Sequence, residues 1–392
     1  MKRVLIFSLA YYPLVGGAEV AVRNITDRIS SGDFEFEMVT LRFRQELPEI
    51  ERIGNILVHR IGKGTFFWKR WFQVAAFLKG SALHRAKPFD VVWGMMAHSG
   101  GIPAMLFKSR FPNVRYVLTL QEGDPISHIK RTMIPAWPLF VNAFRKADVV
   151  QPISIYLGNW ARDMGFRGPL HIIPNAVDTK HFSQEYSKEE LNMLKENLGK
   201  KDGDVYIITT SRIVKKNGIA DVIDSLQLLP LNYAFLILGV GPLEENLKFQ
   251  VADLKLQDRV QFLGQINHRE LPKYLKISDI FTRPSLSEGM GNSFVEAMAA
   301  GLPVVATQEG GIADFLFDPD KNPDKKPTWL AVKPRDPKGL ARQFKRLMED
   351  RELREEIIKN ARELAFEKYD WDLITEEMRN KVFSLRAEQS DR

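Results

Sequence analysis

Two glutamates on either side of a glycine-containing loop are the residues of this 392-residue chain best placed to do chemistry. The segment reads Glu288-Gly-Met-Gly-Asn-Ser-Phe-Val-Glu296. Asn292 or Ser293 can cap a helix that follows, so the loop would present free backbone amides to a phosphate or a sugar oxygen. Glu296 would lie about one turn inside that helix and could accept hydrogen bonds from two ribose hydroxyls, while Glu288 could accept from a sugar. The alternative is that both carboxylates only stabilise the start of the helix through its dipole.

A second glycine-containing turn follows the first apolar run of the chain. Gly16 and Gly17 stand between that run and a helix-like repeat. Glycines let the backbone approach a ligand, and amides at a helix start favour an anion, although a tight turn without a ligand explains the pair equally. A dinucleotide fingerprint would need a further glycine at fixed spacing and an acidic residue about 20 positions later. A dinucleotide-dependent oxidoreductase is therefore disfavoured.

Several kinds of site are excluded by composition and spacing. Cysteine is absent, which removes disulfides, zinc–thiolate sites, iron–sulfur clusters and thiol nucleophiles, and fits a reducing cytoplasm. Asp-x-Asp pairs begin at Asp202, Asp318 and Asp370, but each is typical of a turn or a helix cap. The seven histidines lack metal-ligand spacing, and no Ser/His/Asp hydrolase motif is present. We expect neither a metal ion nor a cofactor.

Short apolar runs alternate with amphipathic segments along the chain. Such runs are typical of strands buried on both faces, and their alternation with helices predicts right-handed βαβ units in parallel sheets. The predicted strands of the first half are 4–9, 36–40, 91–94, 116–120, 149–153 and 171–173. Those of the second half are 205–210, 234–238, 260–263, 280–283, 304–307 and 329–332, with helices over 218–229 and 242–254. The sequence therefore predicts an α/β protein with two doubly wound domains, joined in the polar stretch 175–189.

The amino-terminal half carries an excess of positive charge. Residues 52–146 contain 15 basic and three acidic side chains, and the whole chain has a net charge of +7. The segment 63–72, KGTFFWKRWF, mixes cations with aromatics, and 126–146 is similar. Both are typical of segments that lie at an anionic lipid surface. The alternative is that the aromatics are core residues and the cations form a solvated face.

No apolar run reaches the length of about 18 residues needed for a membrane-spanning helix. Lys2 and Arg3 precede a short apolar stretch, which predicts a buried first strand rather than an export signal.

The chain resembles the family 4 glycosyltransferases of GT-B fold, which use nucleotide-sugar donors and retain the configuration of the transferred sugar. The resemblance covers essentially the whole chain. It is carried by Gly16-Gly17-Ala18-Glu19, Ile173-Pro174-Asn175-Ala176-Val177-Asp178, Ser211-Arg212, Gly239-Val240-Gly241-Pro242 and the segment SEGMGNSFVEAMAAGLPVVAT at 287–307. It implies two Rossmann-like domains facing a cleft: 1–177 for the acceptor and 178–368 for the nucleotide sugar. It also implies that 369–392, with Trp371, form a helix that crosses back to the first domain.

The resemblance also assigns roles to single residues. Arg212 and a following lysine would hold the donor diphosphate in place of a metal ion, where charge develops as the glycosidic bond breaks. Glu288 would hold the donor sugar together with the loop amides, and Glu296 would hold the ribose. The remaining implied donor-binding residues are Gly17, Ile266, Gly289, Met290, Gly291, Asn292 and Ser293.

Two positions depart from the family pattern. Asn217 stands where the family lysine usually lies, so the adjacent Lys216 is assigned to the diphosphate. Gln121 stands where the family has a histidine, and it is assigned to acceptor binding together with Glu122 and His98. Glutamine cannot carry a proton at neutral pH, but in a front-face retaining reaction a donor phosphate oxygen can take the acceptor proton. A nucleotide-sugar-binding protein that has lost turnover is the alternative that these two positions leave open.

The resemblance and the charge distribution together predict the partners. We expect a nucleotide-sugar donor and a hydroxyl acceptor that is a lipid-linked or cell-surface glycan precursor. The basic first domain would contact an anionic membrane, which places the protein in the cytoplasm, peripherally on the inner face of the cell membrane. No nucleic-acid recognition module is present, so nucleic acid is not expected as a partner.

Overall fold

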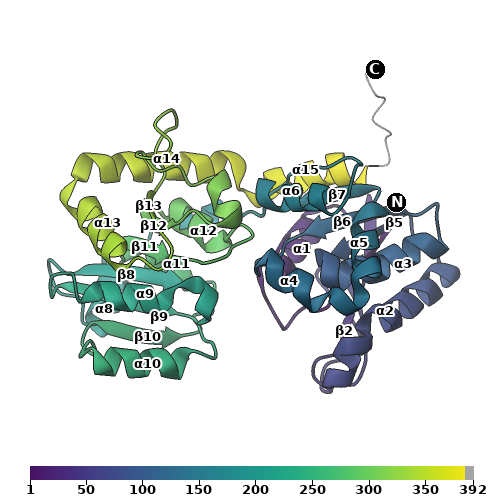
Figure 1. Cartoon of the computed structure of the whole chain (residues 1–392), viewed down its shortest axis with the longest axis horizontal. Coiled ribbons are helices and arrows are strands. Elements are labelled where there is room, and N and C mark those ends of the chain that lie inside the picture. Colours follow the sequence, from purple (N-terminus) through teal and green to yellow (C-terminus); the bar gives the residue numbers. More distant parts are fainter. Residues whose placement is uncertain (385–392) are drawn as a thin grey trace. The chain divides into compact units, whose positions relative to one another are not determined.

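The computed structural model describes residues 1–384, except for the side chain of Phe66. The end of the predicted returning segment, 385–392, lies outside the described residues. The chain divides into two compact units. The first unit comprises 1–175 and the residues from 371 onward, and the second comprises 176–370. Each unit contains its own parallel sheet covered by helices (Figure 1).

The sheet of the first unit has seven strands in the order β3-β4-β2-β1-β5-β6-β7. The strands are β1 (Lys2–Phe7), β2 (Phe34–Leu41), β3 (Ile50–Ile53), β4 (Ile56–Ile61), β5 (Val91–Met95), β6 (Arg115–Leu120) and β7 (Val149–Pro152). All pairings are parallel except that of β3 with β4. The sequence did not predict the β3–β4 hairpin. The predicted strand at 171–173 does not form: this segment runs beside β7 through an isolated bridge between Leu170 and Val150 and through hydrogen bonds from the amides of His171 and Ile173 to Val150 and Pro152.

Helices cover both faces of this sheet. They are α1 (Gly17–Arg28), α2 (Phe66–Ala86), α3 (Ile102–Arg110), α4 (Ile126–Thr132), α5 (Trp137–Arg145) and α6 (Ile155–Asp163), with a π-helical turn η1 (Met96–Gly101) and a 3-10 turn η2 (Ile134–Ala136). From β4 to β7 each crossover moves the same way across the sheet, so right-handed connections place α2, α3 and α5 on one face. Accordingly α3 packs against both α2 and α5. The crossover through α1 runs the opposite way and places α1 on the other face.

The carboxyl-terminal helical segment belongs to the first unit, as predicted. It consists of α15 (Trp371–Glu377) and the π-helical turn η5 (Met378–Phe383). Helix α15 packs against α1, and Arg28 Nε donates to Asp372 Oδ1 at 2.9 Å. The ring of Phe383 lies 5.0 Å from that of Trp93 and 6.0 Å from that of Phe34, measured between centroids. This segment therefore covers part of the core of the first sheet.

The sheet of the second unit has six strands in the order β10-β9-β8-β11-β12-β13, all parallel. The strands are β8 (Val205–Thr210), β9 (Tyr233–Leu238), β10 (Val260–Gly264), β11 (Ile280–Arg283), β12 (Val304–Thr307) and β13 (Leu330–Val332). Every strand predicted for this half is present. Apart from β10, in which only Val260 is fully buried, these strands are buried on both faces, which explains their mostly apolar sequences.

The helices of the second unit differ slightly from the predicted ones. They are α7 (Thr179–Ser183), α8 (Lys188–Asn197), α9 (Ile219–Leu226), α10 (Glu244–Asp253), α11 (Leu271–Lys276), α12 (Asn292–Ala300), α13 (Pro337–Glu349) and α14 (Arg351–Lys368), with a 3-10 turn η3 (Lys215–Asn217). The stretch 175–189 is not a plain linker, because it contains α7, where Asp178 accepts from the amide of His181 at 2.9 Å. Helices α9 and α10 are shorter than expected.

Candidate active site

The predicted residues Arg212 and Lys216 lie just beyond the carboxyl end of β8, the edge at which parallel α/β sheets bind ligands. Arg212 is exposed, and its carbonyl oxygen accepts from Asn217 Nδ2 at 2.7 Å. Lys216 lies in the η3 turn, and its carbonyl oxygen accepts from the amide of Leu286 at 2.6 Å. Asn217 is buried, so it serves to fix the turn that carries both cations.

A glycine fixes the same turn from its other end. Gly218 has a φ of +68°, and a Cβ at this position would lie 2.2 Å from the carbonyl oxygen of Pro284. Only glycine fits so close to another backbone. The turn with Arg212 and Lys216 is thereby held against the segment that follows β11.

Glu288 is paired with an arginine that the sequence analysis missed. Arg283, the last residue of β11, places Nη2 2.9 Å from Glu288 Oε2, and its guanidinium lies 4.5 Å from the centre of the Phe294 ring. The backbone of Glu288 is also held, because its carbonyl oxygen accepts from the amide of Gly311 at 3.1 Å. The available signal was an arginine at the carboxyl end of a predicted buried strand that has no other charged residue.

Helix α12 begins without a side-chain cap, which corrects the prediction that Asn292 or Ser293 caps it. Gly291 is the N-cap, with a φ of 90°, and Asn292 is the first helical residue. A side chain on Gly291 would collide with Arg283, because a Cβ there would lie 2.5 Å from Nη2. The hydroxyl of Ser293 is buried without a hydrogen-bond partner among the described residues. The start of α12 therefore keeps the unsatisfied first-turn amides that an anion or a hydroxyl oxygen can use.

Glu296 is the fifth of the nine residues of α12, about one turn inside the helix as predicted, in a site with little solvent. Burial raises its pKa from 4.5 to about 7, against the opposing effect of the Arg283 charge. Its Oε1 lies 3.9 Å from Nε2 of His268, which the sequence analysis did not identify. His268 stacks on His181 with ring centres 5.3 Å apart. Burial and the neighbouring His181 lower the pKa of His268, while Asp178 acts in the opposite sense.

Ile266 lines a cavity of about 390 Å³ between the loop after β10 and helix α8. Gln265 and Asn267 from the same loop also line it, as do Met193 and Asn197 from α8. The predicted donor-binding residue of this loop therefore lies beside an open cavity.

In the first unit, the predicted residues also lie at the carboxyl ends of parallel strands. Gly17 begins α1 after β1. The amide of the preceding Gly16 donates to Glu19 Oε2 at 2.8 Å, so the glutamate of this motif serves as part of a capping box. Gly17 remains at a helix start, where an anion can bind.

The three candidate acceptor-binding residues lie after β5 and β6. Gln121 Oε1 accepts from Asn175 Nδ2 at 3.2 Å, which leaves the amide NH2 group of Gln121 available to a ligand. Glu122 is buried, accepts from the amide of Ala97 at 2.7 Å and lies 3.7 Å from Nδ1 of His98. Glu122 Oε2 has no hydrogen-bond partner within residues 1–384. The structure thus brings His98 and Glu122 together.

Each unit therefore offers a candidate binding surface of its own. The second unit combines two cations, open helix amides and two carboxylates, which suits a ligand that carries both phosphates and hydroxyls. The first unit offers a helix start and a group of neutral and acidic hydrogen-bonding side chains, which suits hydroxyls.

Two kinds of feature are absent from the described part of the chain. Residues 1–384 contain no group of three or more histidine, aspartate or glutamate side chains placed to hold a metal ion. Within the same residues, no helix has the length and apolar character needed to cross a bilayer.

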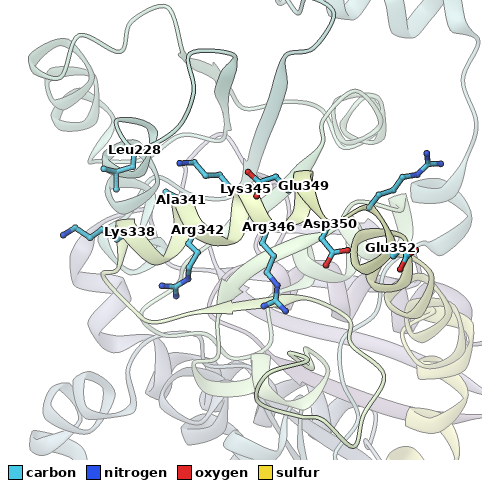
Figure 2. A pocket seen from close by; sticks show the side chains of 10 residues that line it. Leu228, Lys338, Ala341, Arg342, Lys345, Arg346, Glu349, Asp350 and Glu352 are labelled. Atoms are coloured by element: carbon cyan, nitrogen blue, oxygen red, sulfur yellow. The ribbon is translucent and has the colours of Figure 1, made fainter.

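A separate groove of about 970 Å³ runs along α13 (Figure 2). It is lined by side chains of both signs, including Lys338, Arg342, Lys345, Glu349 and Asp350. None of the predicted site residues lines it.

Comparisons with known proteins identify the family of the chain. Residues 192–364 match the family described as "Glycosyl transferases group 1", and residues 15–181 match "Glycosyltransferase Family 4". The 2-deoxystreptamine glucosyltransferase of Streptomyces kanamyceticus is 30% identical over 78% of this chain and 82% of its own length. The alpha-monoglucosyldiacylglycerol synthase of Acholeplasma laidlawii is 26% identical over 81% and 83%, respectively.

Solved structures share the fold. The sucrose-phosphate synthase of Thermosynechococcus elongatus superposes with a TM-score of 0.81 at 20% identity, over 96% of this chain and 97% of its own. Anabaena HepE, solved in complex with UDP and glucose, superposes with a TM-score of 0.79 at 19% identity, over 98% and 100%.

Proposed function

Because the chain belongs to family 4 of the GT-B glycosyltransferases, we propose that it transfers a hexosyl unit from a nucleoside diphosphate sugar to a hydroxyl acceptor, with retention of configuration and without a metal ion. The acceptor that we propose is a lipid-linked or cell-surface glycan precursor. The relatives named 2-deoxystreptamine glucosyltransferase and alpha-monoglucosyldiacylglycerol synthase support a hexosyl donor, and the second name also supports a lipid acceptor.

The observation that carries the proposal is the arrangement around the start of α12. Arg212 and Lys216 are held on a turn that is hydrogen-bonded to the residues before α12. Placed on a donor diphosphate, their charges would stabilise the negative charge that develops on the leaving nucleotide, which is the role a metal ion has in other transferases. The Glu288 carboxylate, fixed by Arg283, would accept hydrogen bonds from the donor sugar. Glu296 would accept them from the ribose.

In this proposal the second unit binds the donor and the first unit binds the acceptor. The acceptor oxygen attacks the anomeric carbon from the side of the leaving group, the bond from that carbon to the diphosphate oxygen breaks, and the acceptor proton passes to a diphosphate oxygen. Gln121, with its free NH2 group, and the His98–Glu122 pair would bind acceptor hydroxyls. No protein side chain has to accept the proton, so glutamine at position 121 is compatible with turnover.

Thermal denaturation of the full chain with a panel of nucleotides tests this proposal. UDP, GDP, ADP and their sugar conjugates are added in the presence of EDTA, with NAD as a control ligand. Stabilisation by one nucleoside diphosphate and its sugar conjugate is the expected result, because a ligand that binds only the folded state raises the melting temperature. A response only after a divalent metal is added would contradict metal independence, and a response only to NAD would contradict the proposed donor.

Donor affinity is expected to rise with pH through the pKa of Glu296. This pKa is about 7 in the free protein, and only the carboxylate can accept hydrogen bonds from both ribose hydroxyls. The ionised fraction grows from about a tenth at pH 6 to about nine tenths at pH 8, so we expect roughly tenfold tighter binding at the higher pH. Isothermal titration of the nucleoside diphosphate at both pH values measures this ratio.

Glu296→Gln is the matched control, because glutamine keeps the shape but does not ionise in this range. Its binding is expected to be weaker at pH 8 and to vary less with pH. Equal affinity of the native chain at both pH values would remove Glu296 from the ribose site.

A further inference from the structure

Helix α2 of the first unit carries a continuous row of large apolar side chains that face the solvent. Phe67 is 61% exposed, Trp71 50%, Val74 45% and Leu78 60%. Single exposed apolar residues are ordinary on protein surfaces, but four on one helix form a patch of the kind that marks an interaction site.

The row lies opposite the face with which α2 packs on the sheet. Phe72 and Ala76 are buried, and a Cβ on Gly80 would lie 2.6 Å from the ring of Phe7. At 100° per residue the four exposed side chains fall within about 60° of arc, centred roughly opposite these three residues. The aromatics of the segment 63–72 are therefore divided: Phe72 belongs to the core, whereas Phe67 and Trp71 do not.

Cations accompany the row and acids do not. Helix α2 contains no aspartate or glutamate. Arg70 and Arg85 are exposed, lie within about 70° of the centre of the row at 100° per residue, and have no ion-pair partner within the described residues. The surrounding segment 52–146 has 15 basic and three acidic side chains. A protein partner would have to match this charge with acids, whereas an anionic bilayer offers negative charge and an apolar interior together.

A second exposed apolar group lies on the same face of the sheet. Ile134 is 65% exposed, Trp137 38% and Leu139 42%, at the start of α5. Helix α3 packs against both α2 and α5 (Figure 1). The helical layer on this face therefore presents two apolar groups to the solvent.

We propose that this helical layer, led by the row Phe67, Trp71, Val74 and Leu78 on α2, docks the enzyme on an anionic lipid bilayer. The apolar side chains enter the region between headgroups and acyl chains, and Arg70 and Arg85 contact the headgroup phosphates. This inference deepens the proposed function, because a lipid-linked acceptor is reached only by an enzyme held at the bilayer surface.

Sedimentation of the full chain with lipid vesicles tests the proposal. Vesicles of phosphatidylcholine alone are compared with vesicles that also contain phosphatidylglycerol, at low and physiological salt. The native chain is expected to sediment with the phosphatidylglycerol vesicles, less strongly at higher salt. Phe67→Ser combined with Trp71→Ser is expected to weaken this binding by about tenfold or more, because two exposed rings no longer leave water on docking. Trp71→Phe, which keeps an apolar ring, is expected to bind nearly as well as the native chain.

Charge and position are controlled separately. Arg70→Glu combined with Arg85→Glu is expected to abolish the preference for phosphatidylglycerol. Phe249→Ser changes an aromatic of the second unit that is 76% exposed, and it is expected to leave vesicle binding unchanged. Lys338→Glu combined with Arg342→Glu reverses two charges on α13 and is also expected to have no effect.

Three outcomes would overturn the proposal: no binding of the native chain to phosphatidylglycerol vesicles, equal losses in the α2 and α13 variants, or self-association in sedimentation velocity that Phe67→Ser with Trp71→Ser abolishes. The last result would show that the row joins two copies of the chain. Nucleotide-induced thermal stabilisation, measured in every variant, separates this failure from failure of the proposed function. Docking can fail while the donor response persists, and the reverse holds as well.

Discussion

Replacing Arg212 with alanine is expected to lower kcat by about two to three orders of magnitude, with a smaller effect on donor binding. The side chain is exposed at the end of β8, and it has no ion-pair partner within residues 1–384, so its charge is available to a ligand. Charge on the diphosphate grows most as the glycosidic bond breaks, and a guanidinium placed there acts mainly on the transition state. Steady-state kinetics with the donor identified by the nucleotide panel measure the loss.

The neighbouring Lys215 provides a matched control. It is an exposed cation on the η3 turn, and Lys215→Ala is expected to retain most of the native kcat. Arg212→Lys should recover part of the activity, because it restores the charge but not the two-pronged hydrogen bonding of a guanidinium. An unchanged kcat in Arg212→Ala, or an equal loss in Lys215→Ala, would remove Arg212 from the catalytic group.

Glu37→Gln is expected to destabilise the first unit by about 3–5 kcal/mol. Glu37, Arg3 and His59 are all buried between β1, β2 and β4. Glu37 forms an ion pair with Arg3, and its Oε2 lies 2.8 Å from Nε2 of His59. Removing the carboxylate charge leaves the Arg3 guanidinium buried without full compensation, which costs far more than loss of a surface pair. Urea unfolding followed by tryptophan fluorescence measures the change.

Glu35→Gln is the control for this pair. Glu35 also contacts Arg3, but its side chain is 28% exposed, and we expect a loss of about 1 kcal/mol or less. Equal effects of the two variants would contradict the special importance of the buried carboxylate.

The buried Glu37 carboxylate also determines how the stability of the first unit changes with pH. Burial opposes ionisation of Glu37, but the His59 hydrogen bond and the Arg3 charge outweigh it and lower the pKa below 4.5. The stabilisation is therefore complete above that pH and is lost as the pH falls through the lowered value.

The sequence predicted best where local pattern and burial coincide. Most strands of the second unit are short, largely buried runs dominated by apolar residues, so hydrophobicity located them. The β3–β4 hairpin was missed because polar residues interrupt it: Glu51 and Arg52 in β3, and the buried His59 and Arg60 in β4. These residues find their partners only after folding, as the contact between His59 and Glu37 shows.

The residues of the candidate site were likewise predictable only where their pattern is local in the sequence. The spacing of Glu288 and Glu296 is local and was visible in the sequence. The pairing of Glu288 with Arg283 joins a strand end to a loop, and the approach of His268 to Glu296 joins the turn before α11 to helix α12. Neither contact has a local pattern, because each depends on how the second unit packs. The same holds for Asn217, whose buried hydrogen bond to the Arg212 carbonyl explains a residue that the sequence marked only as a departure.

The position of Phe383 has a consequence for biosynthesis. Its ring packs against Phe34 and Trp93, yet 290 residues separate it from Trp93 along the chain. During translation, the first 175 residues leave the ribosome well before α15 and η5 are made, so the surface that Phe383 covers stays open to water and to chaperones. The second unit, contiguous from 176 to 370, has no such delay. The unit that is synthesised first is therefore completed last.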